Sequence, residues 1–457
     1  MTYEQAISWI DSRQWSGTGK GIVRSAKLLA LLGNPHKKLK FIHVAGTNGK
    51  GSVSACLSKI LTVAGYRTGL YVSPHLVRFN DRIMYNGEEI GDRDFARIVG
   101  QVREAAEKME DAPTVFEIMT AMGMLYFLEK ACDVVVLEVG MGGRLDSTNV
   151  IDAPELSVIT SIGLDHTKEL GDTLEKIAFE KGGIIKEGCP VVIDGSNKAV
   201  LPVLEDICRT KNAPLTVSRP EKIVRRALGF GREMFSYGGF EDVALSLPGV
   251  YQVKNAAVVV EAVRILQEKG WNISSRDART GMEQVYWPGR FEIIHKEPVF
   301  ILDGSHNPDG VRATKESLCC YFPDQKVRFL IGMLSTKDVE EMVRLIEPMA
   351  QEIAVVMPPS DKAVDSGRMS EMIRRESSVK VRAFESIGAG VEYLLSTAQP
   401  SDVICATGSL YSIDEIRSCA EKVWKRGKMQ ECREESLKEC VDECPESVSE
   451  SRPEGVR

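Results

Sequence analysis

The stretch FIHVAGTNGKGS, residues 41–52, joins an apolar strand to a glycine-rich turn that ends on one lysine, Lys50. Glycines allow backbone N–H groups to turn toward an anion, and the start of the following helix adds partial positive charge. This context favours a loop that binds nucleotide phosphates over a purely structural strand-to-helix turn. The strict pattern GxxxxGK[ST] is not met, because Gly51 separates Lys50 from Ser52. Which hydroxyl would meet a metal ion is therefore open.

Beyond this stretch the chain alternates apolar runs with helical patterns, as a mostly parallel α/β sheet does. The apolar runs carry few polar residues on either face, so helices should cover both sides of the sheet. In the first part of the chain we expect strands at 41–46, 68–73, 133–140, 156–162 and 190–195. We expect helices at 51–64, 92–108, 115–130, 173–185 and 253–270.

The Pro-Gly segment VYWPGRFEII, residues 285–294, predicts a domain boundary. The expected fold class is α/β, with a P-loop, mostly parallel sheet ATPase domain over 1–287 and a smaller Rossmann-like α/β domain over 288–425. Strands of the second domain are expected at 299–305, 327–333, 352–358, 379–385 and 402–409. Residues 426–457 are charged and poor in apolar side chains, which predicts a disordered tail.

Composition excludes several classes of protein. The 457 residues carry a net charge of −7, which argues against a nucleic-acid binder that works through a broad basic face. The N-terminal stretch lacks a signal-peptide pattern, and no run approaches the about 20 apolar residues of a membrane helix. The 11 cysteines form no CxxC pair, so we interpret them as reduced thiols. We expect a cytoplasmic protein without a membrane or nucleic-acid partner.

Three polar residues lie at the ends of expected strands. Ser73, Glu138 and His166 should meet at the carboxyl edge of the sheet, where ligands bind in open α/β folds. A carboxylate in this position is well placed to hold Mg²⁺. An imidazole is a less natural magnesium ligand, and His166 taken alone is better interpreted as a capping or packing residue. Lys181 lies near the C-terminal end of an expected helix. Taken alone, it is interpreted as a lysine whose positive charge the helix dipole favours at that position.

A second polar cluster follows an expected strand in FILDGSHNPDG, residues 300–310, which brings together Asp303, Ser305, His306 and Asn307. A Ser-His-Asp hydrolase is disfavoured, because the three side chains fall within four residues. The chain also lacks a G-x-S-x-G turn. The glycine-rich segment GMGGRLDSTN, residues 140–149, is interpreted as a functional loop.

Taken together, these stretches resemble folylpolyglutamate synthase and dihydrofolate synthase, the folate branch of the Mur-ligase superfamily. The resemblance spans about residues 1–420. It rests on eight motifs in order: KFIHVAGTNGKGS (40–52), SPHL (73–76), VLEVGMGGRLDSTN (136–149), LDHTKELGDTLEKIAFEKGGIIK (164–186), VYQVKNAA (250–257), WPGRFE (287–292), DGSHNPDG (303–310) and ATGSLY (406–411). Gly183 stands where alanine is usual, and we expect little effect from it. Thr336 replaces an acidic residue before a lysine, which leaves the role of that position open.

The resemblance implies an ATP-dependent amide ligase. ATP would phosphorylate a folate or dihydropteroate carboxylate, and L-glutamate would then displace phosphate from the acyl phosphate. By position, the phosphates would contact Gly49, Lys50, Gly51 and Ser52, the nucleotide would contact Asn255, Arg290 and Asp303, and magnesium would bind Ser73, Glu138 and His166. Lys50, Lys181 and His306 would be catalytic, with Lys181 carbamylated, and Phe116 would help hold the pterin. The resemblance also implies a monomer.

Several alternatives remain open from the sequence. We expect a bifunctional enzyme, although the motifs do not separate this from an enzyme with one of the two activities. A Mur-type ligase acting on another carboxylate is the nearest alternative, and GKGS and GGRLDSTN disfavour it. A nucleotide-binding switch protein would bind ATP without glutamate-dependent phosphate release. A P-loop kinase of small molecules would transfer phosphate without needing an amine.

Overall fold

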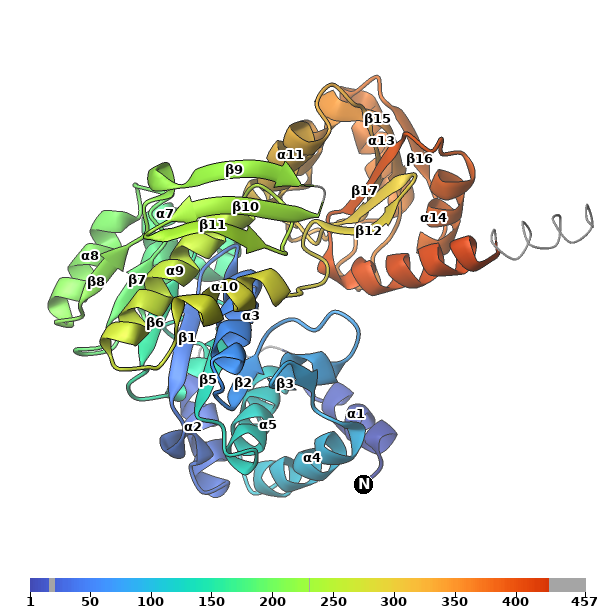
Figure 1. The fold of residues 1–457 in the computed structure, drawn as a ribbon. Helices are drawn as coiled ribbons and strands as arrows, with labels where there is room; N and C mark the ends of the chain where they lie inside the picture. The colour runs from blue at the N-terminus through green and yellow to red at the C-terminus, as the bar shows by residue number, and fades with distance from the viewer. Residues whose placement is uncertain (16–20, 230, 427–457) are drawn as a thin grey trace, which may run out of the picture.

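The computed structural model describes residues 1–15, 21–229 and 231–426. Three sheets organise this part of the chain: one of eight strands, one of three and one of six. Figure 1 shows the eight-stranded and six-stranded sheets in two separate units, with the three-stranded sheet reaching from the first toward the second. The residues predicted to form a tail, apart from Arg426, lie outside the described part. The two predicted domain boundaries stay predictions.

The eight-stranded sheet has the order β4-β3-β2-β5-β1-β6-β7-β8. Its strands run parallel from β2 to β8, and only β3 and β4 are antiparallel to their neighbours. The expected strands are present, each within a few residues of its predicted ends. The bounds are β1 (Phe41–Ala45), β2 (Thr68–Tyr71), β3 (Ile83–Tyr85), β4 (Glu88–Glu89), β5 (Val134–Glu138), β6 (Leu156–Ile159), β7 (Val191–Ile193) and β8 (Leu215–Val217).

The strands β1, β5 and β6 are buried along their whole length, because helices cover both faces of this sheet. One face packs on α3, α9 and α10, and the other on α1, α2, α4 and α5. The bounds are α1 (Tyr3–Asp11), α2 (Gly21–Leu31), α3 (Lys50–Val63), α4 (Asp92–Ala106), α5 (Val115–Glu129), α6 (Thr167–Leu170), α7 (Leu174–Gly182), α8 (Leu201–Thr210), α9 (Gln252–Glu268) and α10 (Ser275–Gln284). The strand β1 is therefore a central, buried strand of the sheet, and the glycine loop follows its carboxyl end.

The three-stranded antiparallel sheet was not predicted from the sequence. It consists of β9 (Val224–Gly229), β10 (Arg232–Tyr237) and β11 (Phe240–Leu245). The turn between β10 and β11, Gly238-Gly239, is a two-residue hairpin signal. Phe235, Tyr237 and Phe240 of this sheet join the same core as α9 and α10. The small sheet thus extends one face of the N-terminal unit toward the second domain.

The six-stranded sheet has the order β12-β13-β17-β14-β15-β16, parallel except for the edge strand β12. Its strands are β12 (Glu292–Lys296), β13 (Val299–Leu302), β14 (Val327–Ile331), β15 (Ala350–Val355), β16 (Lys380–Ala383) and β17 (Val403–Thr407). The helices are α11 (Pro308–Tyr321), α12 (Val339–Ile346), α13 (Ser366–Glu376) and α14 (Ile387–Ser396), and residues 413–426 are also helical. Two apolar clusters fill its two faces. This is the expected second α/β unit, with an antiparallel edge that the sequence reading missed.

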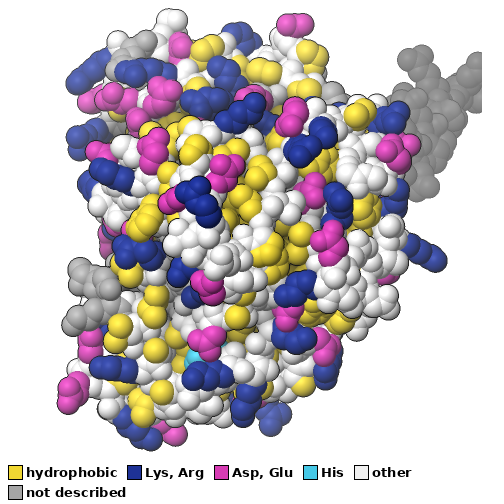
Figure 2. All heavy atoms as spheres, turned by 90° about the vertical axis from the view of Figure 1, so that its left-hand side faces the viewer, with side chains coloured by type: hydrophobic (Ala, Val, Ile, Leu, Met, Phe, Trp, Pro, Cys, Tyr) yellow, Lys and Arg dark blue, Asp and Glu magenta, His cyan; other side chains and the backbone are white. Residues whose placement is uncertain are grey.

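Two further observations concern the surface. In the described part of the chain, the structure contains no helix of the length and apolarity needed to span a membrane. On the face drawn in Figure 2, lysines and arginines alternate with aspartates and glutamates among the coloured residues. Neither sign of charge dominates that face.

Candidate active site

The glycine loop lies at the carboxyl end of β1 and leads directly into α3. Gly49 is the N-cap residue of α3 with φ of 91°, a left-handed conformation that favours glycine. A Cβ on Gly49 would lie only 2.5 Å from Asn255 Oδ1. Because glycine has no Cβ, the Asn255 side chain of α9 can approach the loop backbone. Thr160, which follows β6, also holds the loop, because its hydroxyl donates to Asn48 O at 2.8 Å. The loop therefore lies at a helix N-terminus, as the sequence predicts, and hydrogen bonds hold its backbone.

Gly51, the residue that breaks the usual phosphate-loop pattern, has a steric role in this structure. A Cβ on Gly51 would lie 2.8 Å from the indole Nε1 of Trp287. Trp287 belongs to the predicted domain junction, and its ring packs against the core beside α3. The glycine thus lets the junction cross the start of α3. Ser52, next in the chain, is buried and accepts a hydrogen bond from Gln252 Nε2 at 3.2 Å.

Two lysines from distant parts of the chain donate to one carbonyl of the loop. Lys50 Nζ lies 3.2 Å from Gly46 O and 3.3 Å from Thr47 O. Lys181 Nζ lies 2.7 Å from the same Gly46 oxygen. Burial lowers the pKa of Lys50, and burial together with the charge of Lys50 lowers the pKa of Lys181 to about 7. This arrangement separates Lys181 from an ordinary lysine at a helix end.

Glu138 ends β5 and is almost completely buried. It accepts a hydrogen bond from the Ser73 amide at 3.2 Å. Burial raises the pKa of Glu138 to about 7, and the nearby Lys50 opposes that shift. His166 occupies a left-handed conformation with φ of 49° at the N-cap of α6, and its side chain is 45% exposed. All three predicted metal ligands line the same pocket.

The donors fit a magnesium ion, although they do not form a ready-made cage. Within residues 1–15, 21–229 and 231–426, no three His, Cys, Asp or Glu side chains gather into a possible metal site. Magnesium usually takes one or two carboxylates and completes its shell with water and substrate phosphates. Glu138 is a desolvated carboxylate whose anionic form a bound cation would stabilise. Ser73 offers a hydroxyl at the same pocket wall.

The loop predicted to be functional, residues 140–149, ties the end of β5 to the helix that carries Lys181. Arg144 N donates to Glu180 O at 2.7 Å, and Asn149 Nδ2 donates to Gly183 O at 3.1 Å. A Cβ on Gly183 would overlap the backbone of Arg144. The expectation that glycine in place of alanine has little effect here is therefore wrong for this chain. The loop packs more closely on α7 than an alanine would permit.

The C-terminal domain contributes the loop between β13 and α11. Asp303 is buried and accepts from Ser305 N at 2.8 Å and Ser305 Oγ at 2.7 Å, and burial raises its pKa. His306 Nδ1 lies 2.9 Å from Gly304 O, so Nδ1 carries the proton and Nε2 is left with its lone pair. Burial and the charge of Lys337 lower the pKa of His306 to about 3. Arg290 Nη1 donates to Gly304 O at 3.2 Å and braces the same turn.

All predicted site residues except Phe116 line one pocket between the two domains. The pocket wall includes Gly49, Lys50, Gly51, Ser52, Ser73, Glu138, His166, Lys181, Asn255, Arg290, Asp303 and His306. Phe116, on α5, lies just behind the end of β5, where its ring contacts Tyr71 edge to face at 6.1 Å. A Cβ on Gly140 would lie 2.5 Å from the Phe116 ring. Phe116 is therefore beside the pocket and not part of its wall.

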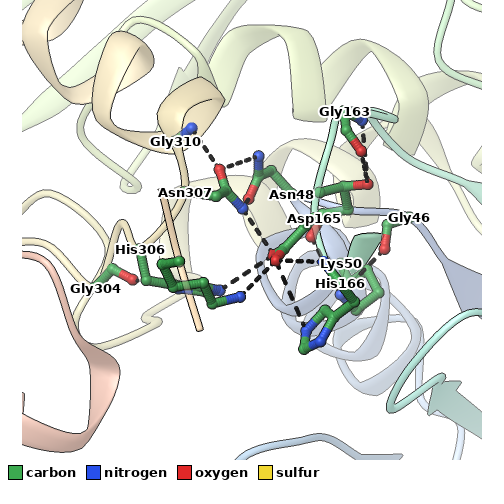
Figure 3. Close-up of polar contacts among 12 residues, drawn as sticks. Gly46, Asn48, Lys50, Gly163, Asp165, His166, Gly304, His306, Asn307 and Gly310 are labelled. Carbon is green, nitrogen blue, oxygen red and sulfur yellow. Dashed lines mark hydrogen bonds and ion pairs between the residues drawn. The ribbon is translucent and has the colours of Figure 1, made fainter. Parts of the chain in front are cut away.

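The sequence reading missed one residue at the centre of this site, Asp165. Figure 3 shows its carboxylate between the two domains, with Asn307 and His306 approaching from one side and His166 from the other. Lys337 Nζ lies 2.5 Å from Asp165 Oδ1. Asp165 stands in the quoted motif LDHTKEL, but nothing in its local pattern distinguishes it from a helix-start aspartate.

The pocket combines a glycine loop at a helix N-terminus with polar side chains of a second α/β unit, and comparison with known families identifies the class of protein. Residues 44–263 match the family described as Mur ligase middle domain, and residues 289–410 match the Mur ligase, glutamate ligase domain. The chain therefore belongs to the Mur ligase family. The two matched regions correspond to the eight-stranded and six-stranded sheets.

Individual relatives narrow the family to its folate branch. The chain is 36% identical over 430 residues to the dihydrofolate synthase/folylpolyglutamate synthase of Bacillus subtilis, covering 91% of this chain and 98% of the relative. A Mycobacterium tuberculosis folylpolyglutamate synthase complexed with ADP superimposes with a TM-score of 0.84 at 28% identity, covering 91% and 97% of the two chains. An Escherichia coli structure in complex with DHPP and ADP gives a TM-score of 0.82 at 27% identity, covering 92% and 98%. The chain is a folate-branch ATP-dependent glutamate ligase.

Proposed function

We propose that this ligase works through an acyl phosphate held between its two domains. A carboxylate oxygen of the folate or dihydropteroate attacks the γ-phosphorus of ATP, and ADP leaves. The amine of L-glutamate then attacks the acyl carbon, an amide bond forms, and inorganic phosphate leaves with the former carboxylate oxygen. The observation that supports this sequence best is the single pocket that both domains line, because an acyl phosphate must be kept from water.

The glycine loop would hold the phosphates of ATP. Amides at Gly49, Gly51 and Ser52 begin α3, where the helix N-terminus favours an anion. Lys50 now rests on backbone carbonyls, and a phosphate would offer it a full negative charge instead. Phosphoryl transfer depends mainly on positioning and charge neutralisation, which this loop provides.

Magnesium would be held by the Glu138 carboxylate, the Ser73 hydroxyl and the His166 imidazole. When bound, it would neutralise phosphate charge at the pocket wall. Glu138 supports this assignment because its buried carboxylate is otherwise costly to ionise. Ser73 donates its backbone N–H to that carboxylate, which fixes this serine next to Glu138.

Lys181 would act as a carbamate. Its amine adds to CO₂ and loses a proton, which converts a buried cation into an anion. A pKa lowered to about 7 leaves a substantial fraction of the amine neutral near neutral pH, as this addition requires. The change of sign would also remove the repulsion between Lys181 and Lys50, which now compete for Gly46 O.

The remaining predicted residues would complete the nucleotide and folate sites. Asn255 faces Gly49 from α9, and Arg290 braces the turn before His306. Asp303 and His306 would meet the nucleotide and the transferring phosphate. The imidazole is neutral as described, and an adjacent phosphate would raise its pKa and make Nε2 a donor. Phe116, beside the pocket, would stack on the pterin.

One assay tests the proposal. Phosphate release from Mg-ATP is measured with dihydropteroate or tetrahydrofolate, each with and without L-glutamate. Release that depends on glutamate and on a folate acceptor is expected, together with a mass gain of one glutamyl residue on the acceptor. Activity with both acceptors would identify the bifunctional enzyme that we expect. Release that ignores glutamate would contradict a ligase and favour a switch protein or kinase. We propose that the enzyme acts in the cytoplasm and as a monomer.

A further inference from the structure

Asp165 forms a junction between the two domains. It follows β6 at the end of a loop of the N-terminal domain and is nearly buried, at 9% exposure. Lys337 and Asn307 of the C-terminal domain both bind its carboxylate, with Lys337 Nζ at 2.5 Å from Oδ1 and Asn307 Nδ2 at 3.0 Å from Oδ2. His306 Nε2 lies 3.7 Å from Oδ2. The two chain segments joined by the Asp165–Lys337 pair are 172 residues apart.

Each partner is also held by hydrogen bonds within its own domain. The His166 amide donates to Asp165 Oδ1 at 2.8 Å, which orients the carboxylate from the N-terminal side. Lys337 stands in the loop between β14 and α12, where its amide donates to Leu334 O at 3.1 Å and its carbonyl accepts from Val339 N at 3.0 Å. The side chains of Lys337 and Asp165 are 9% and 8% exposed. The pair is therefore a buried ion pair across a domain boundary.

Asn307 links the same junction to the phosphate loop. Its Nδ2 donates to Asn48 Oδ1 at 3.1 Å, and Asn48 Nδ2 donates back to Asn307 Oδ1 at 3.1 Å. Asn307 Oδ1 also accepts from Gly310 N at 2.8 Å and so caps α11. Asn307 thus contacts the loop of Lys50 and Asp165 at once. Its neighbour in sequence is His306, so the junction sets where that imidazole enters the pocket (Figure 3).

A buried ion pair of this kind is expected to add little net stability. Removing two charges from water offsets most of their attraction, but leaving one partner alone in the interface is strongly unfavourable. In an open molecule both groups can return to water. The closed arrangement is therefore favoured only when carboxylate, ammonium and amide meet in register. That is the property needed of a contact that forms and breaks as domains close and open.

From these contacts we propose that Asp165 and Lys337 are positioning residues, which fasten the C-terminal domain over the phosphate site and place His306 against the transferring phosphate. Neither needs to touch a reacting atom. The inference rests on the proposed function for the identity of the reaction, and on the geometry alone for the closure of the domains. It predicts that the two residues act as one unit.

A double-mutant cycle tests this coupling. Asp165→Asn and Lys337→Met should each lower kcat by about 10- to 100-fold. The affinity for Mg-ADP should fall much less than kcat, because the glycine loop still holds the phosphates when the contacts from the C-terminal domain are lost. The double variant should be no slower than the slower single variant. Losses that multiply would overturn the proposal, as would losses confined to nucleotide binding. The latter result would place Asp165 in the metal site beside His166.

A second measurement does not depend on ligase activity. Small-angle X-ray scattering of the full chain with Mg-ADP should give a larger radius of gyration for Asp165→Asn and for Lys337→Met than for the wild type. Equal radii would overturn the closure role. The matched control is Asp172→Asn, which removes an exposed ion pair with Lys176 at 2.7 Å within one domain. It should leave kcat within about twofold and the scattering unchanged. The two proposals can fail separately. If the radius of gyration is larger in both variants but the wild type shows no glutamate-dependent phosphate release, the proposed function fails and the closure role stands.

Discussion

Two strand–loop–helix segments face each other across the pocket, and they are built differently. In the first, β1 leads through glycines into α3, and the loop offers backbone amides and Lys50. In the second, β13 leads into α11, and the loop offers the side chains of Asp303, His306 and Asn307. Both use the carboxyl end of a parallel strand and the start of a helix, where ligands bind in open α/β sheets.

The two segments also differ in what fixes them. The first is anchored within its own domain, since Thr47 N donates to Ser161 O at 2.7 Å and Thr47 Oγ1 donates to Gly163 O at 3.0 Å. The second reaches across the boundary, where Asn307 meets Asn48 and Tyr251 donates to Asp303. The comparison teaches that a phosphate site can be preformed in one domain, whereas the groups completing the reaction depend on closure.

The largest expected effect comes from breaking the first segment. Lys50→Ala removes the cation that would neutralise the β and γ phosphates, and kcat should fall by at least about 10³-fold. Steady-state phosphate release measures this, and circular dichroism confirms that the variant is folded. Lys59→Ala, on the same helix α3, is the matched control and should keep nearly full activity. Turnover within tenfold of the wild type in Lys50→Ala would remove the loop from the chemistry.

The next largest loss of activity is expected at Lys181, whose Nζ donates to Gly46 O of the first segment. Lys181→Ala should lower kcat by about 10- to 100-fold, because an anion that supports the metal site is lost. If the active form is a carbamate, acetate or formate at millimolar concentration should restore part of the activity. Wild-type activity without any additive would exclude the carbamate.

The carbamate also predicts the direction of a pH effect. Burial lowers the pKa of Lys181 to about 7, so the amine is neutral above that pH and protonated below it. The carbamate signal from ¹³C-bicarbonate should therefore increase as pH rises through about 7 and be absent in Lys181→Ala. A signal that is constant between pH 6 and 8 would contradict the link between burial and carbamylation.

How much of this could be read from the sequence differs between the two segments. The first was predicted almost completely, because glycines, the lysine and the following helix are adjacent in the chain and each has a local physical reason. Asp303 and His306 were found as a polar cluster and assigned by resemblance. Asp165 was missed, since its partner Lys337 is 172 residues away and only tertiary contact defines it. No local pattern encodes a contact of that kind.

The same limit explains the missed small sheet. β10 follows β9 in the chain, and β10 and β11 are joined through Gly238-Gly239. Their strands alternate weakly, and they pair with each other and not with the parallel sheet that dominates the first half. Gly51 was likewise treated as an irregularity of the motif. The structure explains this glycine by its contact with Trp287, which lies at the opposite end of the predicted N-terminal domain in the sequence.

A smaller effect should come from crowding the contact between Gly51 and Trp287. Gly51→Ala places a Cβ against the indole, and overpacking of this size costs about 1–3 kcal/mol. We expect KM for ATP to rise about tenfold, because the start of α3 or the junction must shift. Trp287→Ala should relieve part of the loss in the double variant. Identical losses with and without the indole would show that the glycine is needed for phosphate contact alone.

The smallest effect on catalysis is expected at the far end of α11, where the second segment has a different tie to the N-terminal domain. There Tyr321 donates its hydroxyl to the fully buried Glu233 and accepts from Gly249 N at 3.0 Å. Tyr321→Phe should lower the free energy of unfolding by about 1–3 kcal/mol, because Glu233 Oε1 and the Gly249 amide lose the partner that this hydroxyl provides. The matched variant Tyr411→Phe, at an exposed ring, should not. Since this tie does not reach the pocket, kcat should stay within about twofold of the wild type. A loss of kcat as large as that expected for Asp165→Asn would show that closure depends on the whole length of α11 and not on the junction at its start.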